Sequence, residues 1–249
     1  MIYVTSDIHG RFDCLKRLLC EVNFSSEDWL YIIGDVIDRN GNGGVDILTW
    51  LLYQPNVQLI LGNHENFLLS NRWLFDQITD DSIAHLDAQH LSLLASWQAN
   101  GGDVTIDALV KETTPALRQD ILDYLLDCPL METVTVGEKR YVLVHGGLGS
   151  YSKEKHFSEY TPHELLWERP TMDTRYDPDA YTVIVGHTPT FVYSPQYRNR
   201  MIKSEGGWWN IDTGAARRDG APMLLCLDTL KEYYIEGDSI LECSDEYRV

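Results

Sequence analysis

The sequence of 249 residues has few cysteines, no long apolar run and few basic residues, and each of these shortages excludes a class of protein. No apolar stretch approaches the roughly 20 residues that a membrane-spanning helix needs, so we expect no membrane partner. The five cysteines are scattered and none forms a CxxC pair, so no zinc knuckle is indicated. The N-terminus reads directly as a strand without a basic region, so we expect no signal peptide and a cytoplasmic protein.

The shortage of basic residues makes the chain strongly acidic. Lysine and arginine total 20 against 38 aspartates and glutamates, which gives a formal net charge of −18. Nucleic-acid binding depends on basic side chains that neutralise phosphates, so we expect no nucleic-acid partner. A local group of cations can still hold a small phosphorylated ligand against the global field. The hydrophobic content of 44% is ordinary for a globular protein with a real core, and it leaves the oligomeric state open.

One stretch organises the rest of the chain. The apolar residues 31–33 end at Gly34 and are followed by Asp35, Asp38 and Arg39. The apolar run predicts a buried strand, and the glycine lets the backbone leave the sheet. Buried carboxylates are costly unless they are paired or bind a metal, and open α/β sheets hold ligands at the carboxyl ends of strands. This stretch alone leaves two interpretations open, a metal or catalytic site and an aspartate that caps the next helix.

The same order of strand, short polar cluster and helix occurs three times. Strands are predicted over residues 1–6, 29–34 and 57–61, and helices over residues 11–22 and 45–53. Asp7, Asp35 and Asn63 follow the three strands at a constant spacing of 28 residues. A βαβ unit has a length of about 30 residues, so the spacing predicts parallel strands with these three side chains at one edge of a sheet.

The remainder of the chain divides into a helical and a β-rich part. Residues 66–130 have helical periodicity and predict a helical insertion or cap, in which His85 and His90 are expected to be structural or exposed. A hairpin is predicted over residues 133–144, and further strands over residues 181–185, 208–214, 223–227 and 232–235. Residues 151–161 and 193–203 are expected to be loops. No linker separates the two parts, so residues 1–249 predict one α/β domain of packed sheets with helices outside.

Five polar clusters follow predicted strands, and each is bounded by glycine. They are Asp7/His9, Asp35/Asp38/Arg39, Asn63/His64, His145 and His187. A single histidine after a strand is more often a hydrogen-bonded core residue than a ligand, whereas five converging clusters favour a metal site. Mixed nitrogen and oxygen ligands suit Mn, Fe or Zn, and six candidate ligands exceed what one tetrahedral zinc needs. The set fits two metals that share a bridging carboxylate.

Taken together, these motifs resemble those of the calcineurin-like metallophosphoesterase superfamily. Within it they are most similar to the phosphoprotein phosphatase (PPP) branch and its bacterial and phage serine/threonine phosphatases. The motifs are DIHG from residue 7, GDVIDR from residue 34, GNHE from residue 62, HGG from residue 145 and GH from residue 186. The resemblance implies two packed mixed β-sheets flanked by helices, the αββα sandwich of that superfamily, with residues 66–130 as a helical insertion.

The resemblance also implies roles for individual residues. The implied metal ligands are Asp7 and His9 for the first ion, Asp35 as the bridge, and Asn63, His145 and His187 for the second ion. Arg39 would hold the phosphoryl oxygens, and His64 would be the general acid, oriented by Asp38. Arg169, which follows Trp-Glu, matches a second phosphate-binding arginine of the bacterial members. The alternative interpretation is that Arg169 is a surface residue that forms a salt bridge. The family usually has glycine at Asn40, and asparagine tolerates a positive φ, so the turn is expected to survive.

The implied activity is that of a metal-dependent phosphomonoesterase, a serine/threonine protein phosphatase (EC 3.1.3.16-like). Water activated by two divalent cations, with Mn²⁺ expected and Fe or Zn as alternatives, would attack in line while His64 protonates the leaving group, without a phosphoenzyme. The substrate would be a phosphorylated protein or a small phosphoester. Three alternatives remain: a symmetrical diadenosine tetraphosphate hydrolase, which shares these motifs, a phosphodiesterase or nuclease on the same fold, and a non-catalytic binding module on a decayed scaffold.

Overall fold

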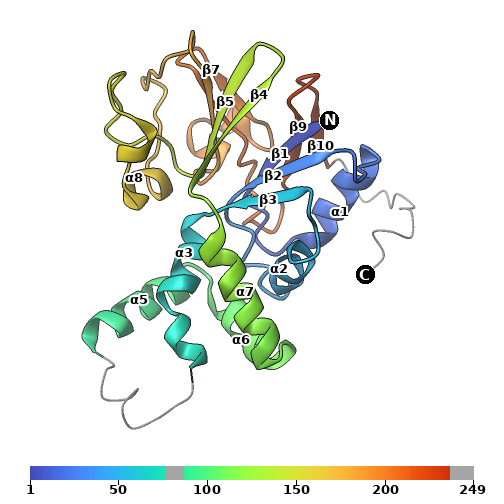
Figure 1. The fold of residues 1–249 in the computed structure, drawn as a ribbon, viewed down its shortest axis with the longest axis vertical. Helices are drawn as coiled ribbons and strands as arrows, with labels where there is room; N and C mark the ends of the chain where they lie inside the picture. Colours follow the sequence, from blue (N-terminus) through green and yellow to red (C-terminus); the bar gives the residue numbers. More distant parts are fainter. Residues whose placement is uncertain (77–86, 236–249) are drawn as a thin grey trace.

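Two five-stranded sheets face each other in the computed structural model, which describes residues 1–76 and 87–235 (Figure 1). Each sheet contains parallel and antiparallel pairs, and helices flank them. The predicted α/β class with two packed mixed sheets is therefore confirmed. His85, for which a structural or exposed role was predicted, lies outside the described residues. Among the described helices, none is long and apolar enough to cross a bilayer.

The first sheet has the order β10-β9-β1-β2-β3. Its strands are β1 (Ile2–Ser6), β2 (Trp29–Ile33), β3 (Val57–Ile60), β9 (Met223–Cys226) and β10 (Glu232–Tyr234). Strands β1, β2 and β3 are parallel and are connected by helices α1 (Phe12–Glu21) and α2 (Val45–Leu51). Because Ser6 pairs with Ile33 and Ile33 pairs with Ile60, the three strands end at the same level. The 28-residue spacing thus places three polar loops at one edge, as predicted.

The second sheet has the order β4-β5-β6-β8-β7. Its strands are β4 (Met131–Val136), β5 (Lys139–Val144), β6 (Thr182–Val185), β7 (Ile202–Ser204) and β8 (Trp208–Asn210). The β4–β5 hairpin is the predicted one, and β5, β6 and β8 are parallel. The segment 193–203 was expected to be a loop; its last two residues belong to β7, and the remainder contains the short 3₁₀ helix at residues 195–197 but no strand. The three residues of β7 are too few for an alternating pattern to stand out in the sequence.

The described residues between β3 and β4 are largely helical. They contain α3 (Asn63–Ser70), the 3₁₀ helix η1 (Arg72–Phe75), α5 (Ala88–Ala99), α6 (Asp103–Glu112) and α7 (Pro115–Asp127). Side chains cap two of these helices: Asp87 accepts from the backbone of α5, and Thr114 accepts from Leu117 with a proline at the first helical position of α7. Helix α3 begins at Asn63 rather than at residue 66, so Asn63 and His64 lie in its first turn.

The core forms three layers around the two sheets. One cluster, which includes Leu15 and Ile32, joins the first sheet to α1, α2 and the insertion helices, whose Trp97 is fully buried in it. A second cluster, with Val4 and Ile184, fills the space between the sheets. A third packs the outer face of the second sheet against α8 (Pro162–Leu166) and nearby segments, among them the 3₁₀ helices η2 (Phe157–Glu159) and η4 (Pro195–Tyr197). A further 3₁₀ helix, η3 (Thr190–Val192), precedes η4 in the chain. Burial on both faces suits the near-continuous apolar runs of parallel strands.

Candidate metal centre and active site

The five polar clusters of the sequence meet where the carboxyl ends of the parallel strands of both sheets come together. Asp7, Asp35 and Asn63 follow the first sheet, and His145 and His187 follow β5 and β6 of the second. All six residues predicted as metal ligands are buried, with exposures from 0% for His145 to 9% for His187. The site therefore lies between the two sheets and draws side chains from each.

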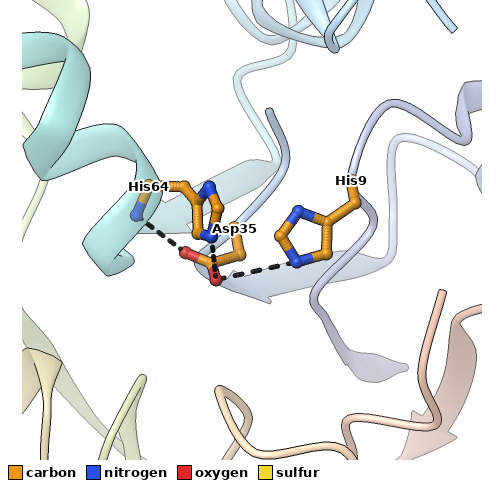
Figure 2. A group of neighbouring side chains, drawn as sticks. All are labelled: His9, Asp35 and His64. Carbon is orange, nitrogen blue, oxygen red and sulfur yellow. Dashed lines mark hydrogen bonds and ion pairs between the residues drawn. The ribbon is translucent and has the colours of Figure 1, made fainter. Parts of the chain in front are cut away.

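Asp35 lies at the centre of this group (Figure 2). Its Oδ2 lies 3.8 Å from Nε2 of His9 and 3.8 Å from Nε2 of His64. Its Oδ1 lies 3.3 Å from Nε2 of His145. Burial favours a neutral carboxyl, but the His145 and His64 rings outweigh it and hold the pKa of Asp35 well below its usual range. One ionised carboxylate thus faces histidines from both sheets.

The histidine rings are oriented so that their Nε2 atoms face the centre. Nδ1 of His9 donates to the carbonyl of Ile37 (2.9 Å), and Nδ1 of His145 donates to the carbonyl of Ile33 (3.0 Å). A carbonyl can only accept, so in the neutral ring the lone pair is on Nε2, as metal ligation requires. Nε2 of His187 is buried without a hydrogen-bond partner among the described residues. A buried polar atom without a partner calls for an explanation, and a bound cation supplies one.

Two groups of side chains are close enough to hold a metal ion, and both include Asp35. The first is His9, Asp35 and His64, and the second is Asp35, His145 and His187, with ligand atoms within 4.8 Å of one another in each group. Asn63 adjoins the second group, since its Oδ1 lies 2.9 Å from Nε2 of His145. Asp7 accepts the backbone N–H of His187 at 3.1 and 3.0 Å. The donor set fits two divalent cations, although the first group contains His64 where the resemblance implied Asp7.

The charges of the site also fit cations. Burial and the neighbouring Asp212 raise the pKa of Asp7 well above its usual range. Burial lowers the pKa of His145, but the neighbouring carboxylate of Asp35 outweighs this effect and raises the pKa to about 10. Burial lowers the pKa of His187 to about 2. The site therefore favours positive charge beside Asp35, which either a proton on His145 or a metal ion can supply, since a cation inverts the local pKa balance.

Asp38 and His64 form a buried pair beside the metal ligands. Nδ1 of His64 donates to Oδ2 of Asp38 at 2.5 Å, and Asp38 is completely buried. Two side chains of the helical insertion hold the same carboxylate: Trp97 Nε1 donates to Oδ2 (2.9 Å), and the Thr105 hydroxyl donates to Oδ1 (2.5 Å). Neither contact was predicted, because nothing in the sequence shows which loop the helices between β3 and β4 contact. The pair is thus tied to the insertion.

The two predicted phosphate-binding arginines each contact a residue at or next to this centre. Nη2 of Arg39 lies 3.3 Å from Nε2 of His64, and Arg39 is exposed. Nη1 of Arg169 donates to the hydroxyl of Thr188 (2.7 Å), which is the residue after His187. No carboxylate among the described residues forms an ion pair with Arg169, and its phosphate-binding role stays a prediction.

Glu65 braces the loops that carry the ligands. Its carboxylate is completely buried and accepts N–H groups of Asp35 (2.8 Å), Val36 (2.9 Å) and Gly62 (2.9 Å). These bonds fix the loop after β2 against the start of α3, while burial raises the pKa of Glu65. The GNHE motif contained this residue, but the sequence analysis assigned it no role.

Asp212 is a further buried carboxylate at the same edge. It lies just beyond β8, with 2% exposure, and its Oδ1 accepts the N–H of Gly214 (2.8 Å). Burial raises its pKa to about 7. The sequence analysis took residues 208–214 for a strand, whereas β8 ends at Asn210. An acid shortly after a strand and before Thr-Gly was the signal that could have revealed it.

The loops of the site contain unusual backbone. Six non-glycine residues have left-handed φ values between 47° and 72°, namely Asp7, His9, Asp35, Asp38, Arg39 and His187. Five of them are Asp or His, types that tolerate this region better than most. A Cβ on Gly186 would lie 2.1 Å from Oδ2 of Asp7, so this glycine permits the close approach of β6 to β1. Strained backbone of this kind is typical of functional sites.

The structure corrects the explanation for Asn40. Asp38, Arg39 and Gly41 have left-handed φ values in this turn but Asn40 does not, so asparagine is not needed there to accept a positive φ. Instead, Nδ2 of Asn40 donates to the carbonyls of His9 (3.0 Å) and Ala215 (3.2 Å), which links three loops of the site. His90, by contrast, is half-exposed and bonds to Asp87 (2.9 Å) in the insertion, in keeping with the structural role predicted for it.

Comparisons with known proteins match this chain to phosphoesterases and tetraphosphatases. The family model described as "Calcineurin-like phosphoesterase" matches residues 1–210. A symmetrical bis(5'-nucleosyl)-tetraphosphatase of Serratia proteamaculans is 41% identical over 70 residues, 27% of this chain and 24% of that protein. The Delftia acidovorans enzyme of the same name is 27% identical over 149 residues, 59% of this chain and 44% of that protein. The chain thus matches less than half the length of these relatives.

Among solved structures, a protein provisionally identified as a diadenosine tetraphosphatase superposes with a TM-score of 0.61 at 18% identity. The superposition covers 94% of this chain and 92% of that one. At this identity the likeness concerns the fold. It agrees with two mixed sheets flanked by helices over nearly the whole chain.

Proposed function

The chain belongs to the calcineurin-like phosphoesterase family, and from this premise we propose that the residues around Asp35 hold two divalent cations and hydrolyse a phosphate ester or anhydride. The observation that carries the proposal is that both possible metal groups share the buried Asp35. Mixed nitrogen and oxygen donors without a thiolate make Mn²⁺ the proposed metal, with Fe or Zn as alternatives. We assign the first ion to His9 and Asp7, and the second to Asn63, His145 and His187.

The cations would supply charge neutralisation for the phosphoryl oxygens and a more acidic water. The chain's own side chains supply the rest. Arg39 and Arg169 each contact a residue at or next to the centre, where guanidinium groups can bind phosphoryl oxygens in the bidentate way that suits phosphate. His64, oriented through Nδ1 by Asp38, presents Nε2 as the atom that gives a proton to the leaving oxygen. Attack is in line and forms no covalent phosphoenzyme.

We propose a dinucleoside tetraphosphate as the substrate, cleaved symmetrically. The support is the name of the curated relatives, which favours this alternative of the sequence analysis over the serine/threonine phosphatase. Symmetrical cleavage breaks the bond between the second and third phosphates and releases two nucleoside diphosphates. Such a substrate is small and highly anionic, so arginines such as Arg39 and Arg169 must offset the repulsion expected from a chain of net charge −18.

A second candidate function, the hydrolysis of phosphomonoesters, is favoured by the buried hydrogen bonds that orient His64. A nucleoside diphosphate is a good leaving group and needs little protonation, whereas the alkoxide of a serine or threonine ester needs a proton in the transition state. The His64–Asp38 pair is buried and braced by Trp97 and Thr105, which suits the harder leaving group. Both activities use the same metal ligands.

A direct comparison of substrates tests the proposal. Enzyme loaded with Mn²⁺ is given a dinucleoside tetraphosphate, phosphoserine and phosphothreonine peptides, and p-nitrophenyl phosphate, with Asp35→Asn as the control that loses the shared ligand. We expect nucleoside diphosphate as the sole nucleotide product and a higher kcat/KM for the tetraphosphate than for the peptides. Higher turnover of the peptides would favour the second candidate. Activity that survives in Asp35→Asn would overturn the assignment of the site.

A further inference from the structure

A cavity of about 710 Å³, lined in part by the segments that follow His9 and Asp212, is unusually rich in arginine. Its lining includes five guanidinium groups, those of Arg11, Arg17, Arg198, Arg200 and Arg218. Among the described residues, two carboxylates, those of Asp13 and Asp219, line it as well. In a chain with a net charge of −18 and only 20 basic residues, five arginines around one cavity are a local concentration of basic side chains of the kind that can attract an anion.

The cavity adjoins the loops that carry metal ligands. Arg11 follows His9 by two residues, and its Nε donates to the carbonyl of Ala215 at 2.8 Å. Asn40, next to Arg39, donates to that same carbonyl and to the carbonyl of His9. Thr213, which also lines the cavity, is the residue after the buried Asp212. The cavity wall therefore shares the loop after β1 with the first metal group, and Asn40 links that loop to the one that carries Ala215.

Three arginines of the cavity region have hydrogen-bond or ion-pair partners. Arg11 donates through Nε and Nη2 to the carbonyls of Ala215 (2.8 Å) and Arg217 (2.5 Å), which orient the guanidinium without neutralising its charge. Asp219 pairs with Arg198 and with Arg217 and brings both towards one rim. Arg218 is exposed on the same turn, and within residues 1–76 and 87–235 it forms no hydrogen bond or ion pair. Preorganised guanidinium groups of this kind are suited to phosphate recognition.

We infer that this arginine cavity binds the phosphate chain of the substrate beyond the phosphoryl group that is attacked at Asp35, an inference that rests on the proposed hydrolysis of a polyphosphate substrate. The ligand class is a di- or triphosphate chain rather than a lone phosphate. A volume of about 710 Å³ lies within the range of small-molecule sites and leaves room for a group attached to that chain. The cavity thus distinguishes long anionic chains from simple phosphomonoesters.

The first test compares selectivity in Arg218→Gln and in Arg140→Gln. Arg140 is exposed at the beginning of β5, the end opposite to His145, so its replacement changes the net charge equally away from the cavity. The readout is kcat/KM for a dinucleoside tetraphosphate divided by kcat/KM for p-nitrophenyl phosphate. We expect this ratio to fall about tenfold in Arg218→Gln, mainly through KM, and to change less than twofold in Arg140→Gln. An equal fall in both variants, or none, overturns the inference.

The second test does not depend on the natural substrate. Inorganic tripolyphosphate and orthophosphate are measured as inhibitors of p-nitrophenyl phosphate hydrolysis at constant free Mn²⁺. In Arg218→Gln the inhibition constant for tripolyphosphate should rise about tenfold, while that for orthophosphate should change much less, since only the longer chain reaches the cavity. Unchanged tripolyphosphate inhibition overturns the inference even if the tetraphosphate is hydrolysed. The expected rise together with a failure to hydrolyse the tetraphosphate overturns the proposed substrate but keeps the phosphate-chain site.

Discussion

Thr105 offers a sharp test of the link between the helical insertion and the candidate general acid. Its hydroxyl lies 2.5 Å from Oδ1 of Asp38 and 3.1 Å from the N–H of Asp38, so it can donate to the carboxylate and accept from the backbone. Valine has nearly the same shape but lacks the hydroxyl. Thr105→Val therefore leaves a completely buried carboxylate with one donor fewer, while Trp97 and His64 still bond to its other oxygen.

The expected effects follow from the lost bond to the carboxylate, since the N–H of Asp38 keeps the carbonyl of Gly43 (3.1 Å) as an acceptor. Hydrogen bonds to charged groups contribute about 1.5–3 kcal/mol, so the free energy of unfolding should fall by about that amount in Thr105→Val. A carboxylate held by fewer donors orients His64 less well, and a loss of about 1.4 kcal/mol in the transition state lowers the rate tenfold. The rate loss should fall on phenyl or alkyl phosphates, which need a proton on the leaving oxygen, more than on p-nitrophenyl phosphate.

The assay measures kcat for phenyl phosphate and for p-nitrophenyl phosphate in the native enzyme, in Thr105→Val and in Thr105→Ser, together with urea unfolding of each. We expect the ratio of the two kcat values to fall about tenfold in the valine variant and to be restored by serine, which keeps the hydroxyl. Equal losses on both substrates, or a serine variant as impaired as the valine variant, would refute the reasoning. A purely structural role would lower both rates in proportion to the folded fraction.

Three further predictions follow from described contacts. His64→Ala should keep two Mn²⁺ ions per chain by elemental analysis yet lose most turnover on alkyl phosphates, and a loss of one ion would instead make His64 a ligand of the first metal. Glu65→Gln should lower the free energy of unfolding in urea by about 2–4 kcal/mol, since an amide nitrogen cannot accept the backbone N–H groups that Glu65 binds, and an unchanged midpoint would contradict this. Cys128, whose pKa burial raises to about 12, should stay a thiol and resist iodoacetamide at pH 8 until the protein is unfolded.

Much of the site could be predicted from the sequence because its residues are attached to strand ends. Asp7, Asp35 and Asn63 repeat at the length of one βαβ unit, and parallel strands that end level bring such residues together. His145 and His187 follow apolar runs of the second sheet in the same way. Local sequence patterns alone predict that these residues lie at strand ends. That the two sheets pack face to face was predicted only from the family resemblance.

The contacts that the sequence did not reveal are those made between elements. Trp97 and Thr105 reach Asp38 only because α5 and α6 pack onto the loop after β2, and nothing in the periodicity of a helix states which loop it will contact. Asp212 was hidden because residues 208–214 read as one strand, whereas the chain leaves the sheet at Asn210. The arginine cavity joins residues near the start of the chain to others near position 200 and position 218, a separation that no local pattern bridges.

The left-handed residues of the site impose two demands on the same positions. Each must offer a particular functional group and must also accept a φ that most side chains avoid, and Asp and His satisfy both. A descendant of this chain that had lost its catalytic task would be released from the first demand but not from the second. Such a chain should drift towards glycine or asparagine at residues 7, 9, 35, 38 and 187, and should gain stability as it does so. The residues found at these five positions in a homologue would therefore distinguish a protein that has lost its catalytic activity from an active enzyme before any assay.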